Sequence, residues 1–392
     1  MNLKRAQRRA FCRKKTQRNE VYAVKAVFRY LKEHIVLCVA IVAAAVTCFL
    51  VPPDRAYLGY FDLRTLTCLF LTLAVICALR HIHFFTILAR RIVMLTGNLR
   101  TLTLALVYIT FIGSMLIAND MALITFLPLG FFALSATDNK RYMAYVFILQ
   151  NISANLGGML TPFGTPQNLY LYSFFKIPTG EFTRIMLPPF LLAVAMLTAA
   201  CFFLPKTALS ITDKFHKSLD KPRTALYLVL FAFSLLIVFR LIPYYIGLVA
   251  IPLVLLFADK KALKEVDYAL LFTFVFFFLF AGNLSRVPAV NDFFATLLQK
   301  STLLVSILSC QVISNVPSAI LLSRFTENYK ELLLGVNIGG TGTLIASLAS
   351  LITYSEYAIF DPKGKKKYLL LFAGVNAVFL VVMTAAAALW FV

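Results

Sequence analysis

The sequence predicts an all-α, polytopic membrane protein made of two inverted repeats, each with a re-entrant hairpin and a broken transmembrane helix. The chain is 60% hydrophobic and 14% charged, against roughly 45–50% and 25% in soluble domains, so a soluble globular fold is excluded. Two uncharged segments with glycine and proline in their middle also recur at a constant offset, one in each half of the chain.

The N-terminal residues 1–33 are rich in Lys and Arg and precede the first apolar run. We expect them to lie on the anionic cytoplasmic leaflet, a more usual role for such a segment than nucleic-acid binding. The first apolar run, about 35–51, lacks a cleavage site and is expected to remain as a membrane helix. Residues 34–205 then form the first predicted repeat, 206–223 a cytoplasmic linker, and 224–392 the second repeat.

In the first repeat, a second span at about 65–79 leads through a basic loop to the stretch 101–137, whose only charged residue is Asp120. This stretch forms either a re-entrant hairpin with Asn119 at its tip or two full spans. The uncharged segment 142–175 then crosses the membrane once as a broken helix. A further apolar span returns the chain to the linker.

The second repeat begins with three spans within 224–285. Residues 286–300 mix charged and apolar positions, which predicts an interfacial helix. The uncharged stretch 301–323 is interrupted at Asn315 and is too short to cross twice at about 20 residues per span, so we expect a re-entrant hairpin. A second broken helix at about 332–354 and a last apolar span complete the chain.

The two broken helices carry matching small and polar residues, such as Asn155 opposite Asn337. Irregular backbone at membrane depth is tolerated only where it lines a buried or watery cavity, and paired interruptions mark the binding sites of secondary transporters. The alternative is that Gly and Pro are simply common in membrane helices, which explains single glycines but not two matched sets. The expected lining residues are Asn155, Gly157, Gly158, Thr161, Thr165 and Asn168 in the first break and Asn337, Gly339, Gly340, Thr341, Thr343 and Ser347 in the second.

A related motif precedes each break: Ala118-Asn119-Asp120-Met121-Ala122 in the first half and Ser314-Asn315-Val316-Pro317-Ser318 in the second. We expect Asn119 and Asn315 to cap the second arms of their hairpins, Ser318 to join the site, and Thr165 to cap the helix that restarts at Pro166. Helix N-termini inside the membrane suit an anion. Unwound carbonyls near Asn119, Asn155, Asn315 and Asn337 would suit Na⁺.

The positive-inside rule sets the predicted orientation. With the N-terminus in the cytoplasm, most Lys and Arg residues fall on the cytoplasmic side. The hairpin around Asn119 then enters from the cytoplasm and the hairpin around Asn315 from outside, so the two halves have inverted topology. The expected location is the inner, cytoplasmic membrane of a bacterium.

This pattern resembles the ion transporter superfamily, which includes divalent anion/sodium symporters, citrate transporters and arsenite permeases, over about residues 30–392. Ala118-Asn119-Asp120-Met121-Ala122-Leu123 looks most like the first hairpin of arsenite permeases and of sodium/proton antiporters of the same clan. The Ser-Asn-Thr signature of the symporters is kept only in part, as Ser314-Asn315-Val316, which leaves sodium coupling and dicarboxylate specificity open. The resemblance implies an elevator-type homodimer whose hairpins and broken helices move.

The expected function is secondary active transport of a small anion, a carboxylate or oxyanion, coupled to Na⁺ or H⁺ by alternating access, with no cofactor other than Na⁺ as a coupling ion. Asp120 is the candidate coupling residue, because an ionisable side chain costs about 2.5–3.5 kcal/mol at mid-bilayer and marks function by default. The alternative role for Asp120 is a carboxylate stabilised at a helix N-terminus.

Other functions are weighed against this one. A Na⁺/H⁺ antiporter that uses Asp120 is the alternative within the same fold, and a passive channel is disfavoured by interrupted repeats. The sequence contains no metalloprotease, serine-hydrolase or paired intramembrane aspartate motif, so an enzyme is not expected. Neither the substrate, nor the choice between symport and antiport, nor the oligomeric state follows from the sequence.

Overall fold

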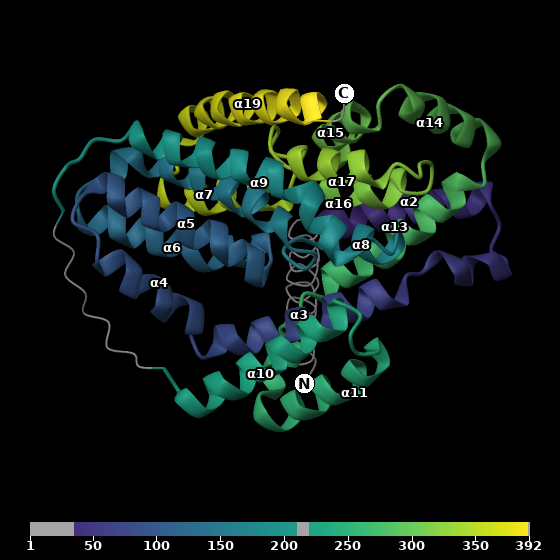
Figure 1. Ribbon diagram of the computed structural model, residues 1–392, viewed down its shortest axis with the longest axis horizontal. Coiled ribbons are helices and arrows are strands. Elements are labelled where there is room, and N and C mark those ends of the chain that lie inside the picture. The colour runs from purple at the N-terminus through teal and green to yellow at the C-terminus, as the bar shows by residue number, and fades with distance from the viewer. Residues whose placement is uncertain (1–34, 210–218, 391–392) are drawn as a thin grey trace, which may run out of the picture.

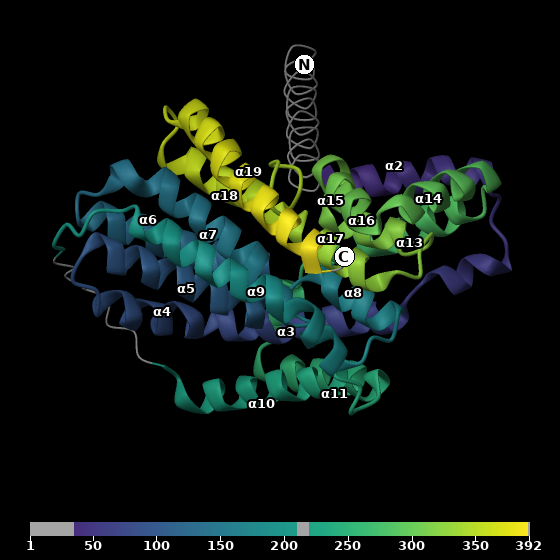
Figure 2. The same cartoon turned by 45° about the horizontal axis from the view of Figure 1, so that its top comes forward.

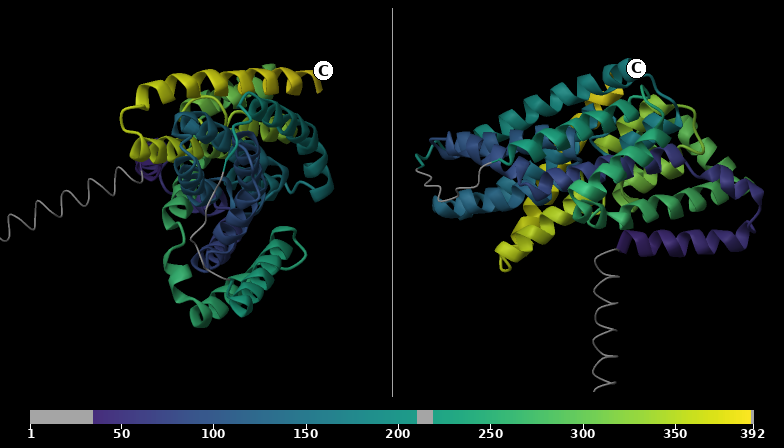
Figure 3. Two further views of the ribbon diagram at one scale, coloured as in Figure 1. Left: turned by 90° about the vertical axis from the view of Figure 1, so that its left-hand side faces the viewer. Right: turned by 90° about the horizontal axis from the view of Figure 1, so that it is seen from below.

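The computed structural model describes residues 35–209 and 219–390. Regular structure in these ranges is helical apart from one isolated β-bridge between Asn98 and Ala208. Most helices run along the long axis of the molecule, while α10 (Lys221–Val238) and α11 (Tyr244–Ala258) lie together along one side (Figure 1, Figure 2, Figure 3). The predicted basic segment, 1–33, lies outside the described residues.

Among the described helices, seven are long and apolar enough to cross a membrane, or eight if one bent pair counts as a single span. The prediction of an all-α polytopic membrane protein is therefore confirmed. The remaining elements in chain order are α2 (Ile35–Leu50), η1 (Arg55–Tyr60), α3 (Leu63–His81), α4 (Phe84–Met94), α5 (Leu99–Ile117), α6 (Asn119–Ala136), η2 (Lys140–Tyr142), α7 (Met143–Gly157), η3 (Gly158–Leu160), α8 (Pro166–Phe174), α9 (Thr179–Phe202), α12 (Lys260–Lys264), α13 (Tyr268–Ser285), α14 (Pro288–Lys300), α15 (Thr302–Ile313), α16 (Asn315–Leu322), α17 (Tyr329–Ile338), α18 (Leu348–Phe360) and α19 (Lys365–Trp390).

One order of elements occurs twice, in α3–α9 and in α13–α19: a long helix, an amphipathic helix, a helical hairpin, a broken helix and a final long helix. Both series start at an aspartate cap. Asp62 accepts a hydrogen bond from the Thr65 amide at 3.0 Å, and Asp267 accepts one from the Leu270 amide at 2.9 Å. Each cap satisfies one of the N–H groups that the first helical turn leaves unpaired.

We call five helices the framing helices: α2, α3, α10, α11 and α13. The α2 helix packs along α13, while α10 and α11 pack along α3. The helices that precede each series therefore pack on the first helix of the other series. A bidentate pair between Arg286 and Asp54, at 3.0 and 2.7 Å, joins the end of α13 to the connection between α2 and α3.

Both hairpins are tight. The α5 and α6 helices pack against each other with only Ala118 between them, and each arm of this helical hairpin is long and apolar enough to cross a membrane. The predicted second hairpin is α15 and α16, with only Ser314 between them. The predicted interfacial helix at 286–300 is α14, which meets α15 at an angle of 119°.

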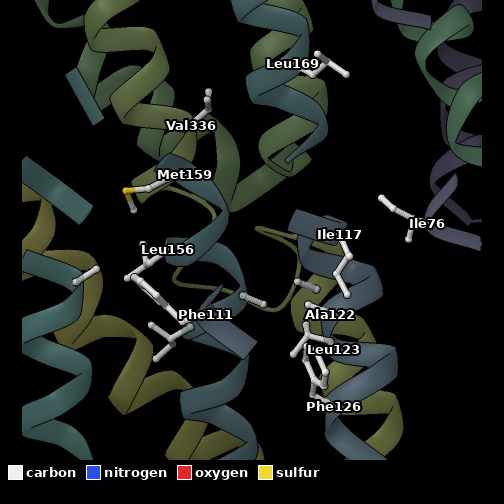
Figure 4. Close-up of a cluster of buried hydrophobic side chains, with 14 of the residues drawn as sticks. Ile76, Phe111, Ile117, Ala122, Leu123, Phe126, Leu156, Met159, Leu169 and Val336 are labelled. Atoms are coloured by element: carbon white, nitrogen blue, oxygen red, sulfur yellow. The ribbon is translucent and has the colours of Figure 1, made fainter. Parts of the chain in front are cut away.

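Each broken helix starts beside its own hairpin and ends beside the other one. The α7 helix packs against α5 and α6, whereas α8 packs against α16; α17 packs against α15 and α16, whereas α18 packs against α6. Buried apolar side chains fill the space around the first hairpin, among them Phe111, Phe126, Leu156 and Val336 (Figure 4). The two halves are thus interleaved at their centre, where the hairpins and breaks meet.

The two hairpin tips share an unusual backbone conformation. Ala118 has φ 66° and ψ 150°, and Ser314 has φ 74° and ψ 159°. This region of φ/ψ space is essentially restricted to glycine, and a residue with a Cβ occupies it at a cost of about 1–3 kcal/mol. Such strain persists only when the surrounding packing enforces it, and here it occurs at the same place in both halves.

Ala118→Gly and Ser314→Gly are each expected to raise the free energy of unfolding by about 1 kcal/mol, because glycine adopts this conformation without a Cβ clash. Ala122→Gly, one turn into α6, is the matched control and should lower it by at least about 0.5 kcal/mol. Thermal melts of the detergent-solubilised protein, followed by circular dichroism, measure both. Equal destabilisation by Ala118→Gly and Ala122→Gly would show that the tip is unstrained.

Candidate functional site

The tips of both hairpins meet both helix breaks in the interior of the protein. Asn119 Nδ2 in the first hairpin donates to Asn155 Oδ1 in the first broken helix at 3.4 Å. A Cβ built on Gly340, in the second break, would lie 3.1 Å from Asn315 Nδ2 and 3.6 Å from Asn155 Oδ1. The three asparagines are 3–4% exposed. We call Asn119, Asn155, Asn315 and Gly340 the junction.

A second asparagine pair joins the two broken helices directly. Asn337 Nδ2, at the end of α17, donates to Asn168 Oδ1 in α8 at 2.6 Å. Asn168 Nδ2 in turn lies 3.3, 3.2 and 3.4 Å from the carbonyl oxygens of Gly158, Met159 and Thr161. Asn168 therefore satisfies the carbonyls that the first break releases from helical hydrogen bonding.

Gln311 in α15 does the same for the second break. Its Nε2 donates to the carbonyls of Gly339 at 2.9 Å and Thr341 at 3.2 Å, and its Oε1 accepts from the Thr343 amide at 2.9 Å. Sequence reasoning missed Gln311, whose only signal is its polarity within an apolar hairpin arm, four residues before Asn315. Its role depends on α15 packing beside α17.

Two paired threonines tie each break to its own hairpin in the same way. Thr161 Oγ1 donates to the Met115 carbonyl at 2.8 Å, and Thr343 Oγ1 donates to the Gln311 carbonyl at 3.1 Å. Met115 and Gln311 each lie four residues before the asparagine of their hairpin tip. The hydroxyl of Thr341 donates to the Ile338 carbonyl at 2.6 Å, so all three hydroxyls fix the backbone of the breaks.

The predicted glycines permit close backbone approach. A Cβ on Gly158 would lie 2.8 Å from the Gly164 carbonyl oxygen, and one on Gly157 would overlap the Phe111 carbonyl of α5. A Cβ on Gly339 would lie 2.9 Å from Cys310 Cβ in α15. Each break therefore packs directly against its own hairpin.

The two predicted serines make hydrogen bonds within the second half of the chain. Ser347 caps α18 by accepting from the Ser350 amide at 3.2 Å. Ser318 donates to the Ser314 carbonyl at 2.7 Å and lies 2.8 Å from Ser309 Oγ, which joins the two arms of the second hairpin.

The predicted caps are wrong in part. Ala118 and Ser314 occupy the cap positions of α6 and α16, and Asn119 and Asn315 are the first helical residues. The chain reverses at one residue with positive φ, so no extended cap residue fits between the arms. Thr165 does precede Pro166 in extended conformation, but its side chain makes no capping hydrogen bond.

Several buried oxygens around the site lack a hydrogen-bond partner among the residues that the structure describes. Leaving such an atom unpaired costs about 1–3 kcal/mol, and amide, hydroxyl and carboxylate oxygens are the atoms that bind hard cations. The described residues contain no cluster of three or more His, Cys, Asp and Glu that would hold a transition metal. The unpartnered atoms are Asn119 Oδ1, Asp120 Oδ1, Thr165 Oγ1, Gln167 Oε1 and Asn337 Oδ1.

Asp120 directly follows Asn119 in α6 but lines a cavity whose wall includes none of the four junction residues. The volume of this cavity, between the first hairpin and the framing helices, is about 30 Å³, and its second carboxylate is Asp267 at the start of α13. The residue pattern did not select Asp267, because an aspartate before an apolar helix is an ordinary helix cap.

A family model described as citrate transporter matches residues 27–329, which include both hairpins and the whole first broken helix. The chain belongs to the citrate transporter family. This transporter is 34% identical over 292 residues to an uncharacterized transporter of Methanocaldococcus jannaschii, covering 74% of this chain and 80% of that protein. It is 28% identical over 279 residues to the inner membrane protein YbiR of Escherichia coli, covering 69% and 73%. The resemblance to the ion transporter superfamily is thereby confirmed.

Gln311→Leu is expected to lower the transporter's free energy of unfolding by about 1–3 kcal/mol, because two carbonyls and one amide of the second break lose their partner. Gln299→Leu, on the exposed face of α14, is the matched control and should change it by less than about 0.5 kcal/mol. Thermal melts in detergent measure the difference. If the two variants melt together, Gln311 does not hold the break.

Proposed function

We propose that this transporter is a secondary active carrier that moves a small anion, a carboxylate or oxyanion, by alternating access at the junction, coupled to Na⁺ or H⁺. The convergence of Asn119, Asn155, Asn315 and Gly340 from four separate elements carries this proposal. The second arms α6 and α16 begin at the hairpin tips, so their N-termini bring positive partial charge to the junction. Buried amides beside these helix ends suit an anion that must leave again.

The mechanism we propose is an elevator movement of two inverted repeats, residues 34–205 and 224–392, joined by the linker 206–223. Three observations support the repeat relation: the repeated order of elements, the shared tip conformation, and the matched threonine contacts to Met115 and Gln311. In this mechanism the hairpins and broken helices move against the framing helices, which form the homodimer contact. The N-terminus faces the cytoplasm, and the similarity to the inner membrane protein YbiR of Escherichia coli supports an inner-membrane location.

In this proposal, unpartnered side-chain oxygens help to coordinate Na⁺ as the coupling ion. Na⁺ near Asn119, Asn155, Asn315 and Asn337 would be coordinated by side-chain amide oxygens and by backbone carbonyls of the breaks, which are the ligand types that Na⁺ transporters use at interrupted helices. Two of these amide oxygens, in Asn119 and Asn337, have no hydrogen-bond partner within the described part of the chain.

The alternative function is a Na⁺/H⁺ antiporter in which Asp120 carries the exchanged ion. The observation that favours it is the position of Asp120 in the wall of a small cavity, with Oδ1 buried and unpartnered among the described residues. An ionisable side chain in such a place serves ion transport by default.

The deciding experiment records transient currents from proteoliposomes exposed rapidly to a panel of small anions, with and without Na⁺, at two pH values. We expect an anion-dependent current that Asn119→Ala and Asn315→Ala reduce at least about tenfold, because each removes a junction amide worth about 1.4 kcal/mol or more. Asn376→Ala is the matched control: among the described residues, this buried asparagine in α19 bonds only the Phe372 carbonyl, at 3.0 Å, and its loss should leave the current intact.

The opposite result selects the alternative. If no anion evokes a current while Na⁺ or pH jumps do, and Asp120→Asn removes that response, the anion proposal fails and cation exchange replaces it. If Asn376→Ala abolishes the anion current as Asn119→Ala does, the junction has no special role.

A further inference from the structure

We propose that Asp120 and Asp267 together bind one monovalent cation, H⁺ or Na⁺, in the cavity between the first hairpin and the framing helices. This inference rests on the proposed function and deepens it, because it places a coupling ion outside the junction and assigns a ligand on the framing helices.

The size of the cavity selects a small ion. Its volume of about 30 Å³ exceeds the roughly 10–15 Å³ that one water molecule requires, but it cannot hold a carboxylate or oxyanion together with its contacts. Its walls are largely apolar and come from α3, the first hairpin and the first break, including Leu69, Ile76, Met121 and Phe163. Figure 4 shows Ile76 of α3 facing the hairpin near Ile117.

The two carboxylates give this cavity its charge. Asp120 Oδ1 is buried without a partner among the described residues, and Asp267 uses Oδ1 to cap α13 at Leu270. Two ionised carboxylates that share a mostly apolar cavity repel each other and are poorly solvated unless a positive charge lies between them. Thr72, also in the wall, donates its hydroxyl to the Cys68 and Leu69 carbonyls, so its oxygen lone pairs remain for the cation.

The charged groups nearby are already paired with one another. Arg80 Nη1 contacts Met121 Sδ at 3.6 Å, but its guanidinium also binds Glu265 at 3.1 Å. His81 bridges Asp259 at 2.7 Å and Glu265 at 2.8 Å. None of these residues lines the cavity. The other charged residues on helices packed against α6 are also absent from its wall; they are Arg90, Arg91, Arg100, Lys140, Arg141 and Glu356.

The cavity also joins two parts that move apart in the proposed mechanism. Asp120 belongs to the first hairpin, whereas Asp267 belongs to a framing helix. A cation held by both residues stabilises this arrangement, and movement of the hairpin divides the ligand set and releases the ion. Ion binding and hairpin position are therefore coupled without contact between ion and substrate.

The test uses the purified full-length protein in detergent and measures its melting temperature. The first comparison measures the melting temperature in choline chloride at pH 5.5 and at pH 8.5, and it detects proton binding. The second comparison replaces choline by Na⁺ at pH 8.5 and detects Na⁺ binding. Because a bound cation stabilises the folded state, the melting temperature should be lower at pH 8.5 than at pH 5.5, or should rise with Na⁺ at pH 8.5. The expected shift is about 2 °C or more.

Asp120→Asn and Asp267→Asn should each remove this shift, and the double variant should remove no more than either single one, because both residues serve one ion. Asn retains capping ability, so Asp267→Asn keeps the start of α13. The matched control is Asp62→Asn, which makes the same change at the cap of α3, does not line the cavity, and should keep the full shift.

A full shift in Asp267→Asn overturns the inference, as does an equal loss in Asp62→Asn. Failure of the proposed function is read separately, from the anion currents. If the shift depends on both aspartates while no anion evokes a current, the cation site stands and anion transport fails. If the current is present and Asp267→Asn keeps the full shift, anion transport stands and the cation site fails.

Discussion

A helix that is interrupted inside a membrane must find partners for its released N–H and C=O groups within the protein, because lipid offers none. In this protein, two side-chain amides supply most of these hydrogen-bond partners. Asn168 reaches three carbonyls of the first break from the helix that follows it, and Gln311 holds the second break from the neighbouring hairpin. The breaks are therefore defined structures, and the helix ends beside them are fixed in position.

The same constraint explains why the two halves are interleaved. Each broken helix leaves its own hairpin and continues beside the hairpin of the other half, so neither half can satisfy and bury its interrupted segments alone. The junction forms where these paths cross. Its strained tips at Ala118 and Ser314 are held by packing from both halves, which lets Asn119 and Asn315 approach the breaks.

Under the proposed function, neutral and charged groups are divided between two places. The junction is built from amides and backbone, which bind an anion without trapping it, whereas carboxylates lie at the boundary with the framing helices. A carboxylate at the junction would repel an anionic substrate. At the boundary, the affinity of the two carboxylates for a cation would depend on the position of the hairpin. The ion and the substrate would therefore be coupled through movement of the protein.

The sequence by itself determined the membrane class, the positions of the second hairpin and both breaks, and most of the polar residues around them. These features are local: apolar length, absence of charge, and Gly, Pro and Asn at fixed spacing reflect the environment of each segment. The repeated pattern also indicated Asn155 and Asn337 as a pair, and the structure places both among the buried contacts of the breaks.

Only the tertiary structure showed that Ala118 alone separates α5 from α6, that Gln311 holds the second break, and that Asp267 shares a cavity with Asp120. It also corrected the caps, because a one-residue reversal moves Asn119 and Asn315 into the helices. These facts depend on how helices distant in the chain cross. Since an apolar helix face looks the same whether it meets lipid or protein, no local pattern encodes which helices become neighbours.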